Sequence, residues 1–459
     1  MAAKFVSIDH DSPLLLPPDL RDWLPSDHMV HFIMDAINAL DLSAARVNIN
    51  GTGSAQYPPS MMLGLLIYSY STGTFSSRRI ETLTFENVAV RFLCADTHPD
   101  HDSICKFRRE NKELLSSCFH QVLELAANAQ VLKVGNITVA IDGTKILANA
   151  SKHSAMSHGH LEKQMDLAEE QIAQLMAKAE DADSTPLEDG LSIPDEIKRR
   201  EDRIAKLKKA KAVMEERAKA RLEEEKAEHQ EKLKKREAKE KATGRKPRGK
   251  KPKPPEEGPR SKDQYNFTDP ESRIMKSGSG FEQAFNAQAA VEVDTMLVVG
   301  QHVTDAPNDK EQLAPGLDSV SAVVGRVSRA LVDTGYFSDK AVSEAESRES
   351  GPTIYAAMQR HHHGRSIEQL EKRDDPPEPP PGATVAEIMK YRLETKAGKK
   401  LYGLRKQTVE PVFGIIKEVL GFRRFSMRGL VKCNLEWDLV NTSYNLKRLF
   451  SMGMRFNNA

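Results

Sequence analysis

Residues 158–242 constrain the fold of this chain more than any other stretch, because they cannot form a globular core. Glu, Lys, Ala, Arg and Leu dominate their composition, so apolar surface can be buried only along one face of a helix. The first half carries apolar residues at a four-three spacing, namely Leu161, Met165, Ala168, Ile172 and Leu175. That spacing is typical of a coiled-coil seam. Pro186, Gly190 and Pro194 then interrupt it.

The second half of this stretch has a sparser apolar stripe. Its members are Ile197, Ile204, Leu207 and Met214. Two long amphipathic helices separated by a Pro- and Gly-containing turn bury their stripes by packing antiparallel. We therefore predict that residues 158–242 form a charged coiled-coil hairpin, inserted between two globular segments.

Residues 243–262 form a segment rich in Lys, Arg and Pro. This composition is too polar to pack a core, so we expect a linker. The basic cluster from Arg245 to Lys253 suits the phosphates of DNA. A solvated linker without a partner is the alternative.

Residues 1–135 predict a compact, all-α N-terminal domain. Apolar residues recur at helical spacing in VHFIMDAINALDL, PSMMLGLLIYSYSTG and CFHQVLELAANAQVL. Two shorter helices are expected at SSRRIETL and at PDHDSICKFRREN. The later one carries Arg108 and Arg109, so the two helices resemble a helix-turn-helix DNA-binding unit. A helical bundle with a solvated basic face is the alternative.

Short apolar runs with β-branched residues flank the charged stretch. One spans residues 136–150, and others are AFNAQAAVEVD, MLVVGQHVTD, SRALVD and PTIYAAM. Helical patterns follow at residues 384–420 and 428–450. Without the insertion, leading strands are followed by alternating helices and strands. This order predicts an α/β fold of the ribonuclease-H-like type with a mixed sheet, followed by a C-terminal helical segment at residues 426–459.

Three acidic residues stand out in the predicted core, which comprises residues 136–157 and 263–425. Asp142 and Asp333 interrupt or end predicted strands, and Glu410 lies on a predicted helix. Neighbouring strand ends and a helix packed on the sheet can bring all three together. Carboxylates are the ligands that hold two Mg²⁺ ions against a phosphodiester. Any one of them alone is more readily a turn aspartate or a surface glutamate. The combination predicts a nuclease or a DNA strand-transfer enzyme.

The bulk composition excludes several other classes. The formal net charge is +1, so DNA binding must depend on local basic patches. The four cysteines form no CxxC pair, which disfavours a zinc site and indicates reduced thiols. We find no signal-peptide pattern and no apolar run of roughly 18–20 residues. A cytoplasmic, nucleoid-associated protein without a membrane partner is expected.

Four motifs together carry a family resemblance. They are DGTK from Asp142, DPESRIMKSGSGFEQAFNAQAAVE, DTGY from Asp333, and YGLRKQTVEPVFGIIK. With these motifs the chain resembles bacterial insertion-sequence transposases of the DDE type, specifically the IS1182-like kind within the IS4/IS5-like group. The helical N-terminal region is also similar to that of the family.

The last motif is similar to the Tyr-Arg-Glu-Lys signature of that group. The matching residues are Tyr402, Arg405, Glu410 and Lys417. The step of seven residues from Glu410 to Lys417 agrees with the signature. Arg405 lies one position further from Glu410 than is common, so Lys406 is an alternative to Arg405.

The resemblance implies a transposase that binds terminal inverted repeats, nicks the element ends and joins the 3′-hydroxyls to target DNA. Asp142, Asp333 and Glu410 would be its catalytic metal ligands, for Mg²⁺ with Mn²⁺ as a substitute. Double-stranded DNA would be the partner. Joining two ends implies a homodimer or a larger assembly on DNA.

Other basic residues are candidates for DNA contacts. Arg405 and Lys417 suit phosphates near the scissile bond, and Tyr402 accompanies them in the motif. The remaining candidates are Lys276, Arg423, Arg424 and Arg428, the last three interleaved with Phe422 and Phe425. Basic and aromatic residues in alternation suit a DNA backbone with a splayed base. A solvated lysine and a helix-packing corner are the alternatives.

Two other functions compete with the transposase prediction. A ribonuclease-H-like nuclease would hydrolyse DNA without strand transfer. A non-catalytic DNA-binding or coiled-coil protein would tolerate neutralisation of all three acids.

Overall fold

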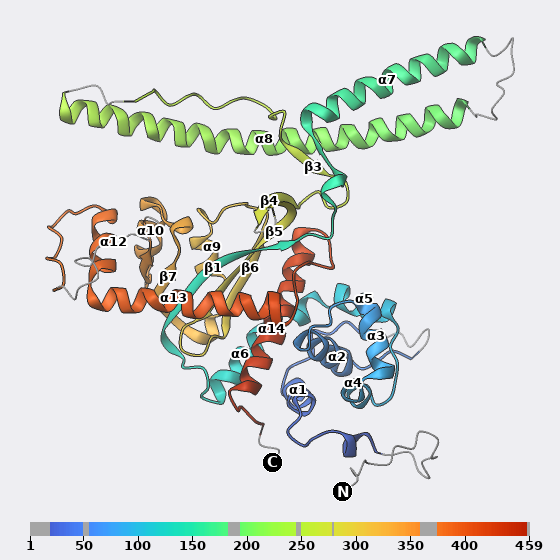
Figure 1. Cartoon of the computed structure of the whole chain (residues 1–459), viewed down its shortest axis with the longest axis vertical. Coiled ribbons are helices and arrows are strands. Elements are labelled where there is room, and N and C mark those ends of the chain that lie inside the picture. Colours follow the sequence, from blue (N-terminus) through green and yellow to red (C-terminus); the bar gives the residue numbers. More distant parts are fainter. Residues whose placement is uncertain are drawn as a thin grey trace, which may run out of the picture. The chain divides into compact units, whose positions relative to one another are not determined.

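The computed structural model describes residues 19–48, 55–181, 193–244, 249–277, 280–358 and 374–456 (Figure 1). The chain divides into two compact units. We call residues 1–147 and 285–459 the main unit, and residues 148–284 the inserted unit.

Helices make up the N-terminal region of the main unit, which confirms the prediction for this part of the chain. In chain order they are η1 (Leu20–Trp23), α1 (Met29–Asn38), α2 (Pro59–Ser71), α3 (Ser77–Glu86), α4 (Val88–Leu93), α5 (His101–Glu110) and α6 (Lys112–Asn128). α2 is buried along most of its length, because α1, α4 and the C-terminal helix α14 (Leu430–Ser451) pack around it. Asp100 begins α5 by accepting a hydrogen bond from the Ser103 backbone N–H at 2.6 Å.

A mixed sheet lies at the centre of the main unit, as predicted. Its strands are β1 (Gly135–Leu147), β5 (Gly280–Glu292, in the main unit from Phe285), β6 (Val298–Thr304), β7 (Gly325–Val332) and β8 (Thr353–Ala356). The strand order is β6-β5-β1-β7-β8. β1, β7 and β8 run parallel, whereas β5 and β6 form an antiparallel hairpin. The predicted strands AFNAQAAVEVD and MLVVGQHVTD correspond to β5 and β6.

Helices connect these strands and pack on them. They are α9 (Leu313–Asp318), η3 (Ala322–Val324), η4 (Thr334–Tyr336), α10 (Asp339–Glu346), α12 (Val385–Glu394), α13 (Lys396–Gly414), the π-helix η5 (Ile415–Val419) and α14. α13 packs on β1 and β7, and α14 packs on β6 and α6 (Figure 1). Trp437 of α14 is fully buried, and its indole N–H donates to the Gln288 carbonyl at 3.0 Å. This tryptophan is therefore a core residue.

The helix predicted over residues 384–420 is divided in the structure. The pattern over residues 384–420 predicts one helix, but α12 ends at Glu394 and α13 begins at Lys396. Thr395 divides them because its extended backbone ends α12 while its side chain caps α13, accepting from the Gly398 N–H at 3.0 Å. Residues 310–324 contain two short helices, α9 and η3.

The inserted unit contains two long helices and short strands. Its elements are η2 (Lys152–Ser154), β2 (Ala155–Ser157), α7 (His158–Asp181), α8 (Ile193–Thr243), β3 (Gln264–Asn266) and β4 (Arg273–Ser277). β2 pairs with β3, and β4 pairs with the first residues of β5, each in antiparallel fashion.

α7 and α8 pack together in opposite directions. Arg200 donates to Gln171 at 3.1 Å, whereas Lys211, further along α8, donates to Glu162 near the start of α7 at 3.0 Å. A small apolar cluster lies between the helices, formed by Leu161, Leu207, Ala210 and Met214. The expected turn with Pro186 and Gly190 lies outside the described residues.

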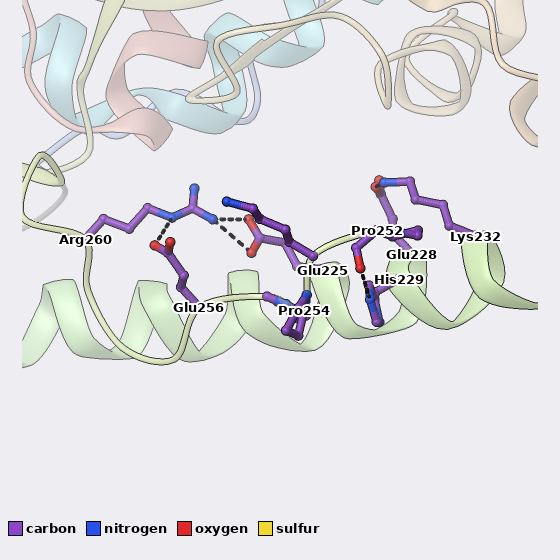
Figure 2. Close-up of a pocket in the computed structure, with 10 residues that line it drawn as sticks. Glu225, Glu228, His229, Lys232, Pro252, Pro254, Glu256 and Arg260 are labelled. Carbon is purple, nitrogen blue, oxygen red and sulfur yellow. Dashed lines mark hydrogen bonds and ion pairs between the residues drawn. The ribbon is translucent and has the colours of Figure 1, made fainter. Parts of the chain in front are cut away.

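The described part of the Lys-, Arg- and Pro-rich segment runs back along α8, which differs from the solvated linker expected. Arg236 of α8 donates to the Gly249 carbonyl at 2.9 Å, and Arg260 donates to Glu225 at 2.8 Å. His229 contacts the Pro252 carbonyl at 3.3 Å (Figure 2). Side chains of α8 thus bind backbone carbonyls and a charged side chain of this segment. A proline-rich segment cannot pair its own carbonyls, because proline has no backbone N–H. A cleft of about 600 Å³ between α8 and this segment is lined by charged and proline residues (Figure 2).

Among the described residues, we find no helix with the length and apolar character needed to cross a membrane.

Candidate active site

Asp142 lies within β1, where the strand crosses the centre of the sheet. Its side chain is 18% exposed, and one oxygen accepts from the Gly143 N–H at 2.8 Å. Burial, followed by the nearby charge of Asp333, raises the pKa of Asp142 to about 6. A carboxylate in this setting is costly to ionise unless a cation accompanies it.

Strand register brings Asp333 beside Asp142. β1 and β7 are parallel neighbours, and Ile141 pairs with Val332, so an aspartate directly follows each residue of this pair. Asp333 also caps the short helix η4, accepting from the Gly335 N–H at 2.6 Å. Its position is therefore set by both the strand and the turn after it.

Arg405 connects Asp142 to Glu410. One guanidinium nitrogen of Arg405 is 3.0 Å from a carboxylate oxygen of Asp142, and the other is 3.3 Å from one of Glu410. The Arg405 side chain is only 10% exposed, whereas Glu410 is 51% exposed. Because α13 packs on β1 and β7, this pairing gathers the three predicted acids at one place.

Tyr402 and Lys417 also reach the two aspartate-bearing strands. The Tyr402 hydroxyl donates to the carbonyl of Val332, directly before Asp333, at 3.1 Å. The Lys417 ammonium donates to the Thr144 hydroxyl at 2.7 Å, and burial lowers its pKa. Lys417 lies in the π-helix η5. The wider turn of a π-helix is frequent at functional sites.

A fourth carboxylate, from Asp309, lies in the same region and was missed by the sequence argument. One of its oxygens accepts from Asn286 at 2.7 Å and from Gln288 at 2.6 Å, both on β5. The Lys145 ammonium is 3.9 Å from that oxygen. The available signal was in AFNAQAAVE, where Asn286 and Gln288 place amides at alternate positions of an apolar strand, and hence on one face.

Gly143 allows these groups to approach. A Cβ atom at this position would lie 2.6 Å from the Asp309 oxygen and 2.8 Å from the Asn286 side-chain oxygen. Any larger residue would therefore displace the polar groups that surround Asp142. This contact explains the glycine in the DGTK motif.

The other predicted DNA-binding residues differ in their exposure to solvent. Arg108 corrects an expectation, because it is 5% exposed and donates to the Tyr70 hydroxyl at 2.7 Å, inside the helical region. Arg109 on the same helix is exposed. Lys276 is exposed on β4 of the inserted unit.

The basic-aromatic segment near the C-terminus divides into two groups. Arg423, Arg424 and Arg428 are exposed, and Arg423 pairs with Glu418. Phe422 and Phe425 are buried, with ring centroids 5.5 Å apart. The expectation that these rings stack on a splayed base is therefore wrong, because both rings are buried in the core.

The donor chemistry of the site fits a hard divalent cation. Carboxylate and amide oxygens are the ligands that Mg²⁺ prefers, and the Asn286 side-chain oxygen is buried without a hydrogen-bond partner among the described residues. In the described ranges, we find no group of three or more His, Cys, Asp or Glu side chains whose arrangement could hold a metal ion. Arg405 instead pairs with two of the acids.

Two family models match this chain. A transposase domain (DUF772) matches residues 18–110, and a transposase DDE domain matches residues 381–450. The chain has the domains of a DDE transposase. The second match includes α13 with Arg405 and Glu410, and a DDE domain implies a catalytic transposase with a ribonuclease-H-like core that acts on DNA. No curated protein and no solved structure matches the chain.

Proposed function

We propose that this DDE transposase, of the IS1182-like kind, binds terminal inverted repeats, cleaves the element ends and transfers their 3′-hydroxyls to target DNA. The observation that carries the proposal is the convergence of Asp142, Asp333 and Glu410. Strand register brings the first two together, and Arg405 connects Asp142 to Glu410.

In this proposal, Asp142, Asp333 and Glu410 are the ligands of Mg²⁺, for which Mn²⁺ substitutes. When bound, the ions supply an activated water or 3′-hydroxyl and stabilise the leaving oxygen. Arg405 is the counter-charge of Asp142 and Glu410 in the metal-free protein. Once those acids hold a cation, the guanidinium is free to donate to a phosphate.

Neighbouring residues position the acids and the DNA. Tyr402 fixes the end of β7 through its hydrogen bond to Val332. Lys417, next to β1 at Thr144, donates to a phosphate near the scissile bond. Other exposed basic residues contact the DNA backbone, namely Arg109, Lys276, Arg423, Arg424 and Arg428.

We also propose roles for the separate parts of the chain. The helical region at residues 1–135 binds the terminal repeats, and the coiled-coil insertion at residues 158–242 contributes to a dimer on DNA. The protein acts in the cytoplasm on the nucleoid. Deleting residues 160–240 and finding an unchanged mass for the protein–DNA complex would contradict the role given to the insertion.

Strand cleavage of a labelled duplex with the element's own terminal repeat tests the catalytic proposal. The variants are Asp142→Asn, Asp333→Asn and Glu410→Gln, and exposed Asp339→Asn is the matched control. We expect Mg²⁺-dependent nicking at the repeat end that falls by about 10³-fold or more in the three variants while repeat binding persists.

The same assay separates the competing functions. Joining of the cut strand to a second duplex distinguishes a transposase from a hydrolytic nuclease. Nicking that survives all three substitutions would mean that the catalytic site lies elsewhere. Repeat binding without nicking by the wild-type protein would indicate a DNA-binding protein.

A further inference from the structure

Asp309 is an acidic residue that the proposed catalytic set leaves unused. It lies in the loop between β6 and α9, and its side chain is 22% exposed. Both Asn286 and Gln288, which are fully buried on β5, donate to the same oxygen of Asp309. These two bonds fix the direction of the carboxylate and occupy only one of its oxygens.

The two oxygens of Asp309 face the residues that follow the two catalytic aspartates. Its first oxygen lies 2.6 Å from the position of a Cβ atom on Gly143, directly after Asp142. Its second oxygen lies 3.8 Å from the corresponding position on Gly335, where an oxygen of Asp333 lies 2.9 Å away. Asp309 therefore lies next to Gly143 of β1, which follows Asp142, and next to Gly335 in the turn that begins at Asp333.

A second observation points to a missing ligand at this place. The side-chain oxygen of Asn286 is completely buried and has no hydrogen-bond partner among the described residues. It lies 2.8 Å from the Cβ position of Gly143, the residue of β1 that follows Asp142. A buried acceptor without a donor is unfavourable unless a cation or an ordered water satisfies it.

We propose that Asp309 is a further ligand of the divalent-cation site, acting with Asp142 and Asp333 through its second oxygen, directly or through a bound water. The inference rests on the proposed function, because it extends the same site. Glu410, which is half-exposed and paired with Arg405, then closes the site on its solvent side.

Binding of Mn²⁺ alone to the full-length, DNA-free protein tests the inference, with free Mn²⁺ quantified by electron paramagnetic resonance. Asp309→Asn is compared with exposed Asp339→Asn, and melting temperatures are recorded without metal. We expect Asp309→Asn to weaken Mn²⁺ binding by about 10–100-fold with a melting temperature at or above that of the wild type, because one of several repelling charges is removed. Asp339→Asn should change neither quantity.

A purely structural Asp309, needed only to hold the two amides, would give the opposite result. Asp309→Asn would then melt earlier while binding Mn²⁺ normally, and this would overturn the inference. If Asp309→Asn does not fold, Asp309→Glu decides, because it keeps the charge and the acceptor but moves the oxygens. Weaker Mn²⁺ binding by a stable Asp309→Glu supports the inference, and unchanged binding overturns it.

Nicking of the terminal repeat separates this inference from the function on which it rests. If the wild-type protein binds Mn²⁺ and nicks DNA, and Asp309→Asn does both equally well, then Asp309 is not a ligand but the proposed function stands. If the wild-type protein neither binds Mn²⁺ nor nicks DNA, the proposed function itself is wrong.

Discussion

The surroundings of Asp142 in the main unit and the α7–α8 pair of the inserted unit treat polar side chains in opposite ways. In the main unit, Asn286, Gln288 and Arg405 are buried and hydrogen-bonded, at positions fixed by strands and by α13. In the inserted unit, pairs such as Lys211–Glu162 lie at the surface of two long helices. Buried polar groups have few alternative partners and hold one geometry, whereas surface charges mainly add to a long-range field. Chemistry is therefore expected from the first unit, and electrostatic attraction from the second.

The distribution of charge sharpens this comparison. Residues 232–253 contain twelve Lys and Arg and two Glu, a net charge of +10. Because the whole chain carries +1, the remaining residues carry −9. Lys250, Lys251 and Lys253 are exposed on the segment that runs back along α8. The positive charge of this DNA-binding protein is thus concentrated in the inserted unit, whereas the rest of the chain has a negative net charge.

The largest expected difference comes from the same core truncation made in each unit. Leu446 of α14 is fully buried in the main unit, and Leu207 of α8 is 2% exposed in the inserted unit. Leu446→Ala should destabilise the main unit by about 2–5 kcal/mol. Leu207→Ala should melt only the packing of α7 on α8, since its apolar cluster is small.

Two optical signals in urea unfolding check this prediction. Both tryptophans, Trp23 and Trp437, belong to the main unit, so fluorescence follows that unit, while circular dichroism at 222 nm follows the helices of both. Leu446→Ala should shift the fluorescence transition, and Leu207→Ala should shift only part of the dichroism signal. Equal fluorescence shifts in both variants would show that the units unfold together.

The parts of the site that the sequence predicted are those fixed by regular structure. Asp142 and Asp333 are predicted from acids that interrupt or end neighbouring strands; in the structure Asp333 directly follows β7, whereas Asp142 lies within β1, next to the pairing of Ile141 with Val332. The mixed sheet and the helical N-terminal region follow from periodicity, which a single sequence displays. The amphipathic pattern predicts that Glu410 lies on a helix, and Glu410 lies on α13.

The parts that were missed depend on loops and on side-chain contacts between distant residues. Asp309 lies in a loop without periodicity, and its partners on β5 are more than twenty residues away. Arg108 was taken for a surface residue because its burial depends on Tyr70, far from it in sequence. The break at Thr395 follows from one capping bond that competes with helix continuation.

Asp438 provides a pH-dependent test of polar burial in the main unit. It lies on α14 and is 8% exposed, it accepts from Gln301, and burial raises its pKa to about 7 from an ordinary 3.8. A raised pKa means that its contribution to stability is fully present below about pH 4 and is lost as the pH rises through 7. The main unit should therefore become less stable between pH 4 and 8.

Asp438→Asn should remove this part of the pH dependence. The variant is expected to be more stable than the wild type by roughly 1–3 kcal/mol at pH 8, with little difference at pH 4. The new amide N–H can also donate to the Gln301 oxygen, which has no partner among the described residues. Fluorescence-detected urea titrations at several pH values measure the difference, and a variant that is less stable at pH 8 would contradict the prediction.

The basic segment of the inserted unit should control the salt dependence of DNA binding. Replacing Lys250, Lys251 and Lys253 with Gln should reduce the slope of log K against log salt concentration by up to about 3, since each phosphate contact contributes about 0.9. The control replaces three exposed lysines of α8 outside that segment, Lys198, Lys206 and Lys209. Fluorescence anisotropy of a labelled duplex in increasing KCl gives both slopes. Equal changes in the two triple variants would mean that the segment has no special part in DNA binding.

The smallest effect is expected for a single ion pair on the surface of the inserted unit. The Lys211 ammonium is 3.0 Å from Glu162, and the two side chains are 33% and 46% exposed. Water and salt screen such a pair, so a double-mutant cycle with Glu162→Gln and Lys211→Gln should give a coupling of about 0.2–1 kcal/mol, followed by dichroism at 222 nm. The coupling should shrink further in 0.5 M KCl. A larger coupling that is insensitive to salt would mean that the pair is shielded from water. The polar contacts of the inserted unit would then resemble the buried ones of the main unit more than the exposed fractions of Lys211 and Glu162 indicate.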